Sequence, residues 1–233
     1  MIKVKLLSYT KNPEETCVAA IRQCYSEIGA SEIHKNITNS LKKRLLKQVI
    51  TSGHTSTLEH AGFTFAIEGI SRACTHQLVR HRIASYSQQS QRYVQAGKNF
   101  KYIIPPAIKN NVRALKIFKA NIQLSKKAYD NLINLGIQRE DARFILTNAA
   151  ESKIVVTMNV RSLFNFFEKR LCHRAQWEIR KLAQLMLNEV KKAAPNIFQY
   201  IGPTCQTQKI CWENKLSCGF YKSITGAELK SRC

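Results

Sequence analysis

Apolar and polar positions in the first part of the chain predict a strand followed by two helices. Residues 2–9 alternate between apolar and polar side chains, as half-buried strands do. The sequence NPEE at 12–15 places a capping Asn, a Pro and two acids where a helix begins, and we expect this helix to end near Gly29. A second amphipathic helix is expected over residues 41–50, and Gly53 can end it in a left-handed conformation.

A strand and a short helix then lead into a long polar segment. Residues 62–70 alternate in the manner of a strand, and residues 71–79 have helical spacing. Residues 80–93 (RHRIASYSQQSQRY) follow directly. From Ala84 to Tyr93 this segment contains no aliphatic run that could face a core. Residues 100–104 (FKYII) form another candidate strand before two prolines.

The second half of the chain is predominantly helical. Apolar side chains recur at helical spacing over residues 107–134, and Gly136 closes that helix. We expect a short helix over 139–146, a β-branched strand over 153–160 and one long helix over 161–194. No internal repeat or low-complexity linker separates these elements, so the sequence predicts one domain that mixes helices and strands.

Length and apolar content are those of a globular chain with an ample core. At 233 residues and 44% hydrophobic content, the chain can form one large domain or two small ones. No window approaches the ~18 apolar residues of a membrane span, and the N-terminal sequence MIKVKLLSYT lacks the layout of a signal peptide. We therefore expect a cytoplasmic location and no membrane partner.

The charge balance is strongly basic, with 37 Lys and Arg against 15 Asp and Glu and a net charge of +22. Nucleic-acid binding through counterion release is one interpretation. An enzyme whose ligands are all anionic is a second, because the summed field steers anions. A third is an ordinary surface on which lysines replace other polar residues. The lysines are dispersed, so the charge alone does not decide for nucleic acid.

The eight cysteines favour thiols or metal ligands over disulfides, because the chain has no export signal. Cys205, Cys211 and Cys218 follow one another in the spacing C-x5-C-x6-C, which is not that of a paired zinc knuckle. Cys172 could supply a fourth thiolate, although the reach along a continuous helix is nearly maximal. We expect ordinary reduced cysteines and no metal, and keep a four-thiol metal site as the alternative.

Polar residues also gather at 54–60 (HTSTLEH), a turn with two His and one Glu. Such a turn can serve for capping alone, or it can contact a ligand from a loop between packed elements. A zinc site is a weak alternative, because His54 and His60 lack a recognised ligand spacing. In residues 80–93, the guanidinium groups of arginines and the side chains of Ser and Gln can bind a phosphate or a planar heterocycle. A solvated basic loop would have a similar composition. We expect an anion site in residues 80–93.

Residues 80–93 resemble a signature of one enzyme family. Arg80-His81-Arg82, seven further residues and Ser90 match the RHR-x7-S signature of the flavin-dependent thymidylate synthases. Matches to other segments of the family follow in the same order: His54, Glu59-His60, Phe63-Thr64-Phe65, Ile83 to Tyr86, Arg92-Tyr93, Arg143, Asn159, Arg161, Asn165, Arg170 and Ala175 to Ile179. A three-residue motif alone is weak evidence, and the shared order of these matches makes the resemblance specific.

The resemblance implies an α+β fold, with a mixed or antiparallel sheet flanked by long helices in a single domain. This domain would occupy residues 1–201, and residues 202–233 would form a cysteine-containing tail. The resemblance also implies a homotetramer with active sites between subunits. The implied reaction is methylation of dUMP to dTMP with 5,10-methylenetetrahydrofolate as carbon donor, FAD as redox carrier and NADPH as reductant.

The same resemblance assigns ligand contacts by position. The residues that match FAD contacts are His54, Ser56, Arg80, His81, Arg82, Asn159, Arg161 and Asn165. Those that match dUMP contacts are Gln77, Leu78, Val79, Arg80, Gln88, Gln89, Ser90, Gln91, Arg92, Arg143 and Arg170. The catalytic candidates among these residues are Arg170, Ser90 and His54.

Helical spacing agrees with part of this assignment. Arg161 and Asn165 are four residues apart, so they share one face of a helix and can serve one ligand. Arg170 lies on the opposite face, because nine residues at about 100° each turn the helix by about 900°. One helix with ligand contacts on two faces fits a site that several subunits assemble.

Some positions depart from the family's pattern or have another explanation. His76 stands where many members carry Arg, and Gln88 stands where an acid is common. These changes bear on nucleotide affinity and pH dependence more than on activity. Arg143 could instead form a surface pair with Glu140 or Asp141.

Two other functions compete with the synthase. A basic nucleic-acid-binding protein without catalysis would bind in a salt-sensitive way and be colourless, whereas a flavoenzyme would be yellow. A hydrolase that uses Ser90 and His81 is the third class, but the chain has no G-x-S-x-G elbow. No carboxylate in the motif would orient His81 as a base, so we assign Ser90 to phosphate binding.

Overall fold

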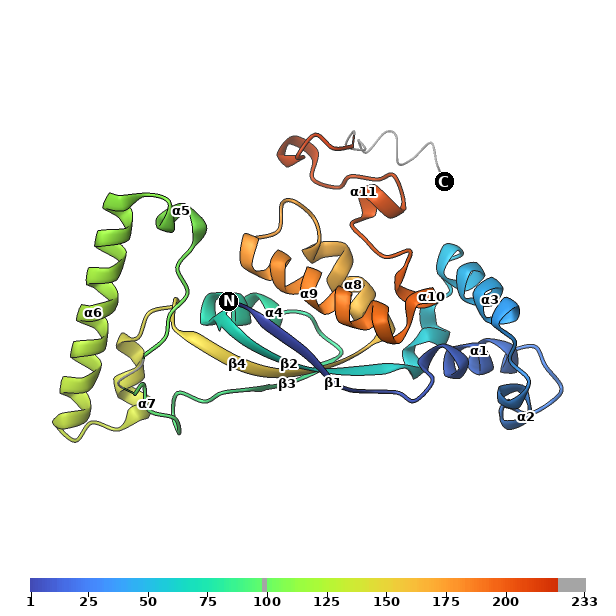
Figure 1. The fold of residues 1–233 in the computed structure, drawn as a ribbon, viewed down its shortest axis with the longest axis horizontal. Helices are drawn as coiled ribbons and strands as arrows, with labels where there is room; N and C mark the ends of the chain where they lie inside the picture. Colours follow the sequence, from blue (N-terminus) through green and yellow to red (C-terminus); the bar gives the residue numbers. More distant parts are fainter. Residues whose placement is uncertain (98–99, 222–233) are drawn as a thin grey trace. The chain divides into compact units, whose positions relative to one another are not determined.

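The computed structural model describes residues 1–97 and 100–221, which fall into two compact units (Figure 1). Unit 1 comprises Met1–Lys3, Ile67–Arg80 and Tyr86–Val155. Unit 2 comprises Val4–Ala66, His81–Ser85 and the chain from Val156 onward. The end of the tail predicted over 202–233 lies outside the described residues, because these stop at 221.

One sheet contains strands in the order β1-β2-β4-β3. Its strands are β1 (Lys3–Tyr9), β2 (Gly62–Ser71), β3 (Ala84–Gln88) and β4 (Glu151–Asn159). The predicted α+β class with an antiparallel sheet is confirmed. Three of these strands match predicted ones, whereas β3 lies in the polar segment 80–93, where no strand was expected.

Unit 2 packs its helices around an aromatic core. Its helical segments are α1 (Pro13–Gln23), α2 (Ala30–Lys35), α3 (Asn39–Thr51), η1 (Thr55–His60), α8 (Val160–Arg170), α9 (Trp177–Ala193), α10 (Pro195–Phe198), α11 (Thr204–Thr207) and η3 (Asn214–Leu216). Phe198 is fully buried, and its ring lies 5.5 Å from Phe63, 5.8 Å from Phe164 and 6.1 Å from Phe167, centroid to centroid. Edge-to-face contacts of this kind add to the free energy of apolar burial. They hold α8 and α10 in a fixed arrangement.

The long helix predicted over 161–194 is wrong, because α8 ends at Arg170 and α9 begins at Trp177. The Gln176 side chain caps α9 by accepting hydrogen bonds from the backbone N–H groups of Glu178 (3.0 Å) and Ile179 (3.2 Å). Side-chain capping satisfies N–H groups that have no partner inside a helix. The intervening turn contains no Gly or Pro, so the usual sequence signals of a break are missing.

Unit 1 is built around one long helix. Its helical segments are α4 (Arg72–Leu78), α5 (Pro106–Lys109), α6 (Val112–Asn134), α7 (Arg139–Ala142) and η2 (Arg143–Ile145). The helix predicted over 107–134 is interrupted at Asn111, whose side chain caps α6 by accepting from the Ala114 N–H at 3.0 Å. Gly136 has the expected left-handed conformation (φ +84°). The strand predicted over 100–104 is wrong, since Tyr102 forms only an isolated bridge with Ala150.

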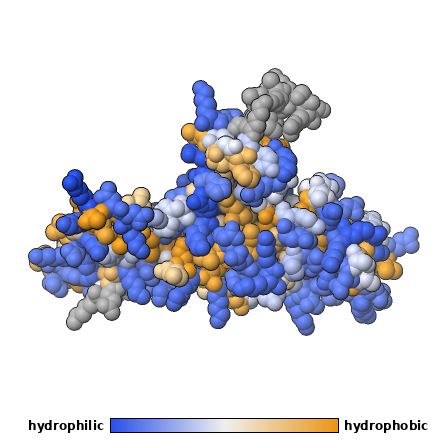
Figure 2. Space-filling view, turned by 45° about the horizontal axis from the view of Figure 1, so that its top comes forward, coloured by the Kyte–Doolittle hydropathy of each residue, from blue (hydrophilic) through white to orange (hydrophobic). Residues whose placement is uncertain are grey.

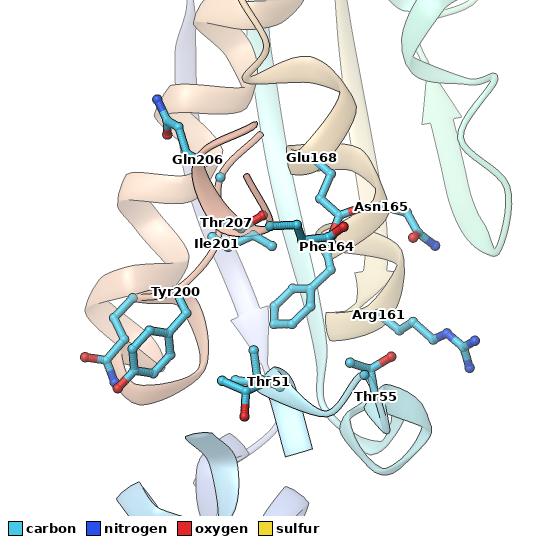
Figure 3. A pocket seen from close by; sticks show the side chains of 15 residues that line it. Thr51, Thr55, Arg161, Phe164, Asn165, Glu168, Tyr200, Ile201, Gln206 and Thr207 are labelled. Atoms are coloured by element: carbon cyan, nitrogen blue, oxygen red, sulfur yellow. The ribbon is translucent and has the colours of Figure 1, made fainter. Parts of the chain in front are cut away.

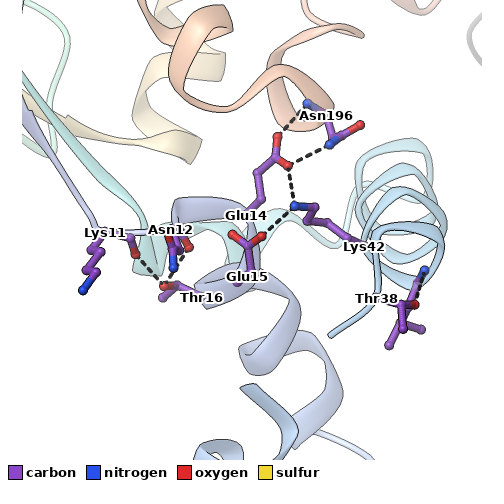
Figure 4. A network of polar contacts seen from close by, with 9 residues as sticks. Lys11, Asn12, Glu14, Glu15, Thr16, Thr38, Lys42 and Asn196 are labelled. Carbon is purple, nitrogen blue, oxygen red and sulfur yellow. Dashed lines mark hydrogen bonds and ion pairs between the residues drawn. The ribbon is translucent and has the colours of Figure 1, made fainter. Parts of the chain in front are cut away.

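The first helix, α1, ends at Gln23 rather than near Gly29. A buried carboxylate near its start joins it to the chain that follows α9. Glu14 is 5% exposed, and its carboxylate accepts hydrogen bonds from the Asn196 backbone N–H (2.6 Å) and side-chain amide (2.7 Å). Lys42 Nζ lies 3.7 Å from the same carboxylate and 2.6 Å from that of Glu15 (Figure 4). This network connects α1, α3 and α10.

Hydrophilic residues cover much of the face seen in Figure 2, with apolar residues among them. Within residues 1–97 and 100–221, every helix is too short or too polar to cross a membrane.

Candidate functional site

The two groups of predicted ligand contacts fall largely into different units. Apart from Arg80, the predicted FAD contacts belong to unit 2; apart from Arg170, the predicted dUMP contacts belong to unit 1. The chain leaves unit 1 after Arg80 and returns to it at Tyr86. The signature segment therefore contributes His81–Ser85 to unit 2 and the residues from Tyr86 onward to unit 1.

A cavity of about 760 Å³ in unit 2 is lined by α8 and by the chain that follows α10 (Figure 3). Arg161 and Asn165, four residues apart, line it from α8, so they share one face of this helix as expected. Gly53 and Thr55 also line it, and they flank the predicted FAD contact His54. The structure thus brings the turn at 54–60 and the first turns of α8 to one cavity.

The start of α8 is fixed by capping and ion pairing. Asn159 accepts a hydrogen bond from the Ser162 N–H at 2.9 Å, so its side chain acts as the N-cap. Arg161 Nη1 lies 2.7 Å from Glu59 Oε1 in an exposed pair. A pair that water screens contributes little to stability. The Arg161 guanidinium can therefore exchange Glu59 for an anionic ligand at a small cost.

His81 of the signature contacts Arg170 and Phe166 of α8 within unit 2. Arg170 Nε donates to His81 Nε2 at 2.9 Å, and the His81 ring packs edge-on against Phe166 at 5.0 Å. Burial lowers the pKa of His81 to about 4, with further lowering by the positive charges of Arg170 and Lys169. His81 is therefore a neutral hydrogen-bond acceptor at neutral pH.

Ile83 holds the signature segment in a left-handed backbone conformation. Its φ is +60°, which is unfavourable for a β-branched residue, and its side chain is 77% exposed. The Ser162 hydroxyl donates to the Ile83 carbonyl oxygen at 2.8 Å. This bond ties the segment after His81 to the first turn of α8. Strained residues of this kind cluster at functional sites.

Gln88 takes the place of the family's common acid and lies in a polar environment of unit 1. Its Nε2 donates to Thr75 Oγ1 at 3.1 Å and to Ser152 Oγ at 3.0 Å. Thr75 in turn donates to the Arg72 carbonyl oxygen at 2.9 Å. An amide suits this position because it is a donor, which a carboxylate is not. Gln88 thereby joins β3 to α4 and β4.

The residues after β3 line a second cavity, of about 210 Å³, in unit 1. Gln89, Ser90 and Gln91 line it, and Ser90 Oγ accepts from the Arg92 N–H at 3.1 Å. The Arg92 guanidinium forms an exposed ion pair with Glu140 and lies 5.4 Å from the Tyr93 ring centroid. These groups suit an anion, since Arg and hydroxyl groups donate hydrogen bonds to phosphate oxygens.

Arg143 makes neither of the surface ion pairs considered for it. Its Nε donates to the Glu140 carbonyl oxygen at 3.0 Å, while the Glu140 carboxylate pairs with Arg92. Burial lowers the pKa of Arg72, and the positive charge of Arg143 lowers it further. Two guanidinium groups that repel one another favour an anion between or beside them. Arg72 was not predicted as a candidate anion contact, because it lies outside the signature. Its segment has the sequence pattern of an ordinary helix.

Some predicted contacts have structural roles of their own. Leu78 is fully buried, and its carbonyl oxygen accepts the Tyr86 hydroxyl at 3.0 Å. Burial raises the pKa of Tyr86 to about 12, which keeps that hydroxyl a donor. The side chains of Gln77 and Val79 do not line either cavity described above. In the described residues no three His, Cys, Asp or Glu side chains are placed to hold a metal ion, so the turn at 54–60 shows no zinc site.

The larger cavity also has lining residues that the sequence did not indicate. Glu168 lines it from α8, and burial raises the pKa of this carboxyl group. Tyr200, Gln206 and Thr207 line it from the chain that follows α10 (Figure 3). No motif in the sequence marks these positions, and only the packing of the tail against α8 and the end of α3 brings them to the cavity.

Comparisons with known proteins identify the family of the chain. A family profile described as "Thymidylate synthase complementing protein" matches residues 5–196. The flavin-dependent thymidylate synthase of Clostridium tetani is 49% identical over 94% of this chain and 93% of its own length. That of Geobacter sulfurreducens is 48% identical over 94% of both chains.

The fold resembles that of a solved structure. The UMP/dUMP methylase PolB from Streptomyces cacaoi, bound with 5-Br dUMP, matches with a TM-score of 0.76 and 22% identity, over 85% of this chain and 94% of that one. The identity to the curated relatives extends over nearly the whole length of both chains, and the profile match contains all the predicted ligand contacts. The chain belongs to the flavin-dependent thymidylate synthase family.

Proposed function

We propose that the protein methylates dUMP to dTMP with FAD as redox cofactor, NADPH as reductant and 5,10-methylenetetrahydrofolate as carbon donor. Family membership over residues 5–196 is the observation that carries this proposal. The fold's likeness to a methylase solved with a dUMP analogue supports the choice of a pyrimidine nucleotide. The flavin would supply the hydride chemistry when bound.

Unit 2 provides side chains that suit a flavin dinucleotide. The cavity of about 760 Å³ is in the size range of cofactor sites. Arg161 offers a guanidinium to a diphosphate, and Asn165 offers an amide on the same helix face. His81 adds no positive charge to unit 2, because it is neutral at physiological pH. Of the catalytic candidates, we place His54 here, on the turn beside Gly53 and Thr55.

Unit 1 provides side chains that suit the nucleotide. Ser90 and Arg92 lie on one turn after β3, and we assign both to the phosphate of dUMP. Arg143 stabilises the negative charge that develops on the uracil oxygens as the one-carbon unit is transferred and reduced. We assign the same role to Arg170. No protein nucleophile is required for this chemistry, so Ser90 acts as a binding group rather than as an attacking one.

We propose a homotetramer with active sites between subunits. The exposed pair of Arg161 with Glu59 and the exposed Arg80 and Arg82 side chains leave cationic groups at the surface. These groups can meet ligands that other subunits also contact. The tetramer is tested by sedimentation velocity of the flavin-loaded protein.

Two paired substitutions test the function. Arg161→Gln should lower the flavin content of the purified protein, whereas Arg44→Gln, an exposed arginine on α3, should leave it unchanged. Arg143→Gln should weaken dUMP binding by about 10- to 100-fold, as loss of a charged hydrogen bond does; the exposed Arg113→Gln should leave it unchanged. A colourless protein that binds RNA in a salt-sensitive way and forms no dTMP would contradict the proposal.

Ser90→Ala distinguishes phosphate binding from nucleophilic catalysis. If Ser90 binds phosphate, the variant keeps measurable dTMP formation at saturating dUMP, with a raised KM. Complete loss of dTMP formation with dUMP binding intact would contradict the assignment.

A further inference from the structure

The described part of the C-terminal tail, residues 202–221, brings cysteines together beside the turn between α8 and α9. A cavity of about 550 Å³ is lined by Cys172 in that turn, by Cys205 in α11 and by Cys211. Burial raises the pKa of the Cys205 thiol, and the neighbouring thiols of Cys172, Cys211 and Cys218 raise it further. Cys172, Cys205 and Cys218 are free thiols. Residues from two distant parts of the sequence therefore converge on one place, as the ligands of a structural metal do.

Backbone and side-chain hydrogen bonds shape the loop that carries two of these thiols. Cys211 is 8% exposed, and its Sγ donates to Ser217 Oγ at 3.5 Å. Ser217 also accepts the Gly219 N–H at 3.2 Å, and Gly219 has φ +80°. A hydrogen bond therefore joins the two residues that flank Cys218 in the turn. Its geometry needs a glycine at 219, because few other residues adopt that backbone conformation.

Positive charge surrounds the cysteines. Lys169, Arg170 and Arg174 line the same cavity, and Arg174 Nε lies 3.9 Å from a Glu213 carboxylate oxygen. Four thiolates around a divalent cation have a net charge of −2, which neighbouring cations stabilise.

We propose that Cys172, Cys205, Cys211 and Cys218 bind one divalent cation of the zinc type as four thiolates. Each thiol loses its proton on binding, so one Zn²⁺ and four thiols give a complex of charge −2 and four released protons. In the described residues no three His, Cys, Asp or Glu side chains stand ready around a central point. The proposal therefore requires the cysteine side chains to change rotamer when the cation binds.

The metal would connect the tail to the end of α8, the helix that carries the predicted FAD contacts Arg161 and Asn165. Glu168 on α8 lines both the cavity with the cysteines and the larger cavity with Arg161. The tail also lines that larger cavity, through Gly202 and Gln206. A cation held by Cys172 on one side and by the tail cysteines on the other fixes the tail where it closes the larger cavity.

Metal analysis of the full-length protein tests the site directly. The protein is purified under reducing conditions without chelator, and its zinc and iron are measured by mass spectrometry. We expect one zinc per chain in the natural protein and in Cys24→Ser, a control at an exposed cysteine outside the cluster. Cys205→Ser and Cys218→Ser should each bind zinc at least about tenfold more weakly, because a ligand is lost. Less than a tenth of an equivalent of zinc in the folded natural protein would overturn the proposal, as would stoichiometric iron in its place.

Thiol labelling gives a second measurement that needs no substitution. With zinc present, alkylation followed by peptide mass spectrometry should spare Cys172, Cys205, Cys211 and Cys218 while it modifies the exposed Cys24. After a chelator removes the metal, all four should react. Equal labelling of the four thiols before and after chelation would overturn the site. The flavin and dTMP measurements do not depend on these outcomes, so this proposal and the proposed function fail separately.

Discussion

Arg170 donates a hydrogen bond to the ring nitrogen Nε2 of His81 over 2.9 Å, and this bond exists only while His81 is neutral. A protonated His81 would carry a donor where the acceptor now is and would face a guanidinium. The bond connects the signature segment to the last turn of α8. Both residues lie in unit 2, and protonation of His81 would break this bond between them.

The first prediction concerns the titration of His81. NMR of the ring should give a pKa far below the ordinary 6.5, near about 4. Burial is the largest cause, so Arg170→Gln should raise this pKa only in part, while Arg174→Gln, which alters an exposed arginine paired with Glu213, should leave it unchanged. An unshifted His81 would show that the ring is solvated.

The same shift predicts how stability depends on pH. The unfolded chain takes up the proton near pH 6.5 and the folded chain only near about 4, so the unfolded state binds more protons between these values. The contribution of His81 is therefore complete above pH 6.5 and is lost as the pH falls toward 4. Urea unfolding at several pH values should show a smaller loss for His81→Gln than for the natural protein. Parallel losses would contradict the shift.

The second prediction concerns Gln88. Glu at this position could not donate to Thr75, whose hydroxyl proton is already bonded to the Arg72 carbonyl oxygen. We expect Gln88→Glu to lower the free energy of unfolding by about 1–3 kcal/mol and to weaken dUMP binding about tenfold through repulsion of the phosphate. Urea unfolding and calorimetric titration with dUMP measure these effects. Gln123→Glu on the exposed face of α6 is the control, and equal effects of both changes would contradict a specific role for Gln88.

Periodicity predicted much of the fold because most elements have one buried face. β1, β2, β4, α3 and α4 were expected within a few residues of their observed bounds. The errors have physical causes. The break between α8 and α9 depends on the Gln176 cap, and β3 consists of residues that alternate in exposure without being apolar. Neither feature changes the apolar periodicity on which sequence reasoning rests.

The site was predictable where a local motif marks it. The signature and the spacing of Arg161 and Asn165 directed attention to the face of α8 that lines the larger cavity. No local motif indicates Arg72 or Glu168, because burial and neighbouring charges that shift their pKa values arise only in the folded chain. The position of Cys172 was also misjudged: the long-helix assumption made its reach to the tail nearly maximal, whereas it lies in a turn beside the tail cysteines.

The third prediction uses the strain at Ile83. Glycine has no Cβ and adopts φ +60° without cost, whereas the left-handed region costs other residues about 1–2 kcal/mol. Ile83→Gly should therefore be more stable to urea than the control Ile28→Gly, an exposed isoleucine without positive φ, by about 1 kcal/mol. Ser162→Ala removes the bond to the Ile83 carbonyl and should cost about 1 kcal/mol. Equal stabilities of the two glycine variants would mean that Ile83 is not strained.

The fourth prediction concerns Glu14, whose carboxylate accepts both hydrogen bonds of Asn196 and lies 3.7 Å from Lys42 Nζ. Glu14→Gln keeps the size of the side chain, but it removes the charge and presents a donor amide to a donor amide of Asn196. We expect the free energy of unfolding to fall by about 2–3 kcal/mol, because one N–H of Asn196 loses its acceptor in a nearly buried place. Lys42 keeps its hydrogen bond to Glu15 but loses the nearby charge of Glu14.

Glu32→Gln is the matched control for this change, because Glu32 pairs with Lys35 at 3.4 Å on the exposed surface. Such a pair contributes less than about 0.5 kcal/mol. Urea unfolding of both variants measures the difference, and similar losses would show that the buried network contributes no more than a surface pair. Since Asn196 begins the segment that leads to Tyr200 and the larger cavity, Glu14→Gln should also lower flavin retention during purification, while Glu32→Gln should not.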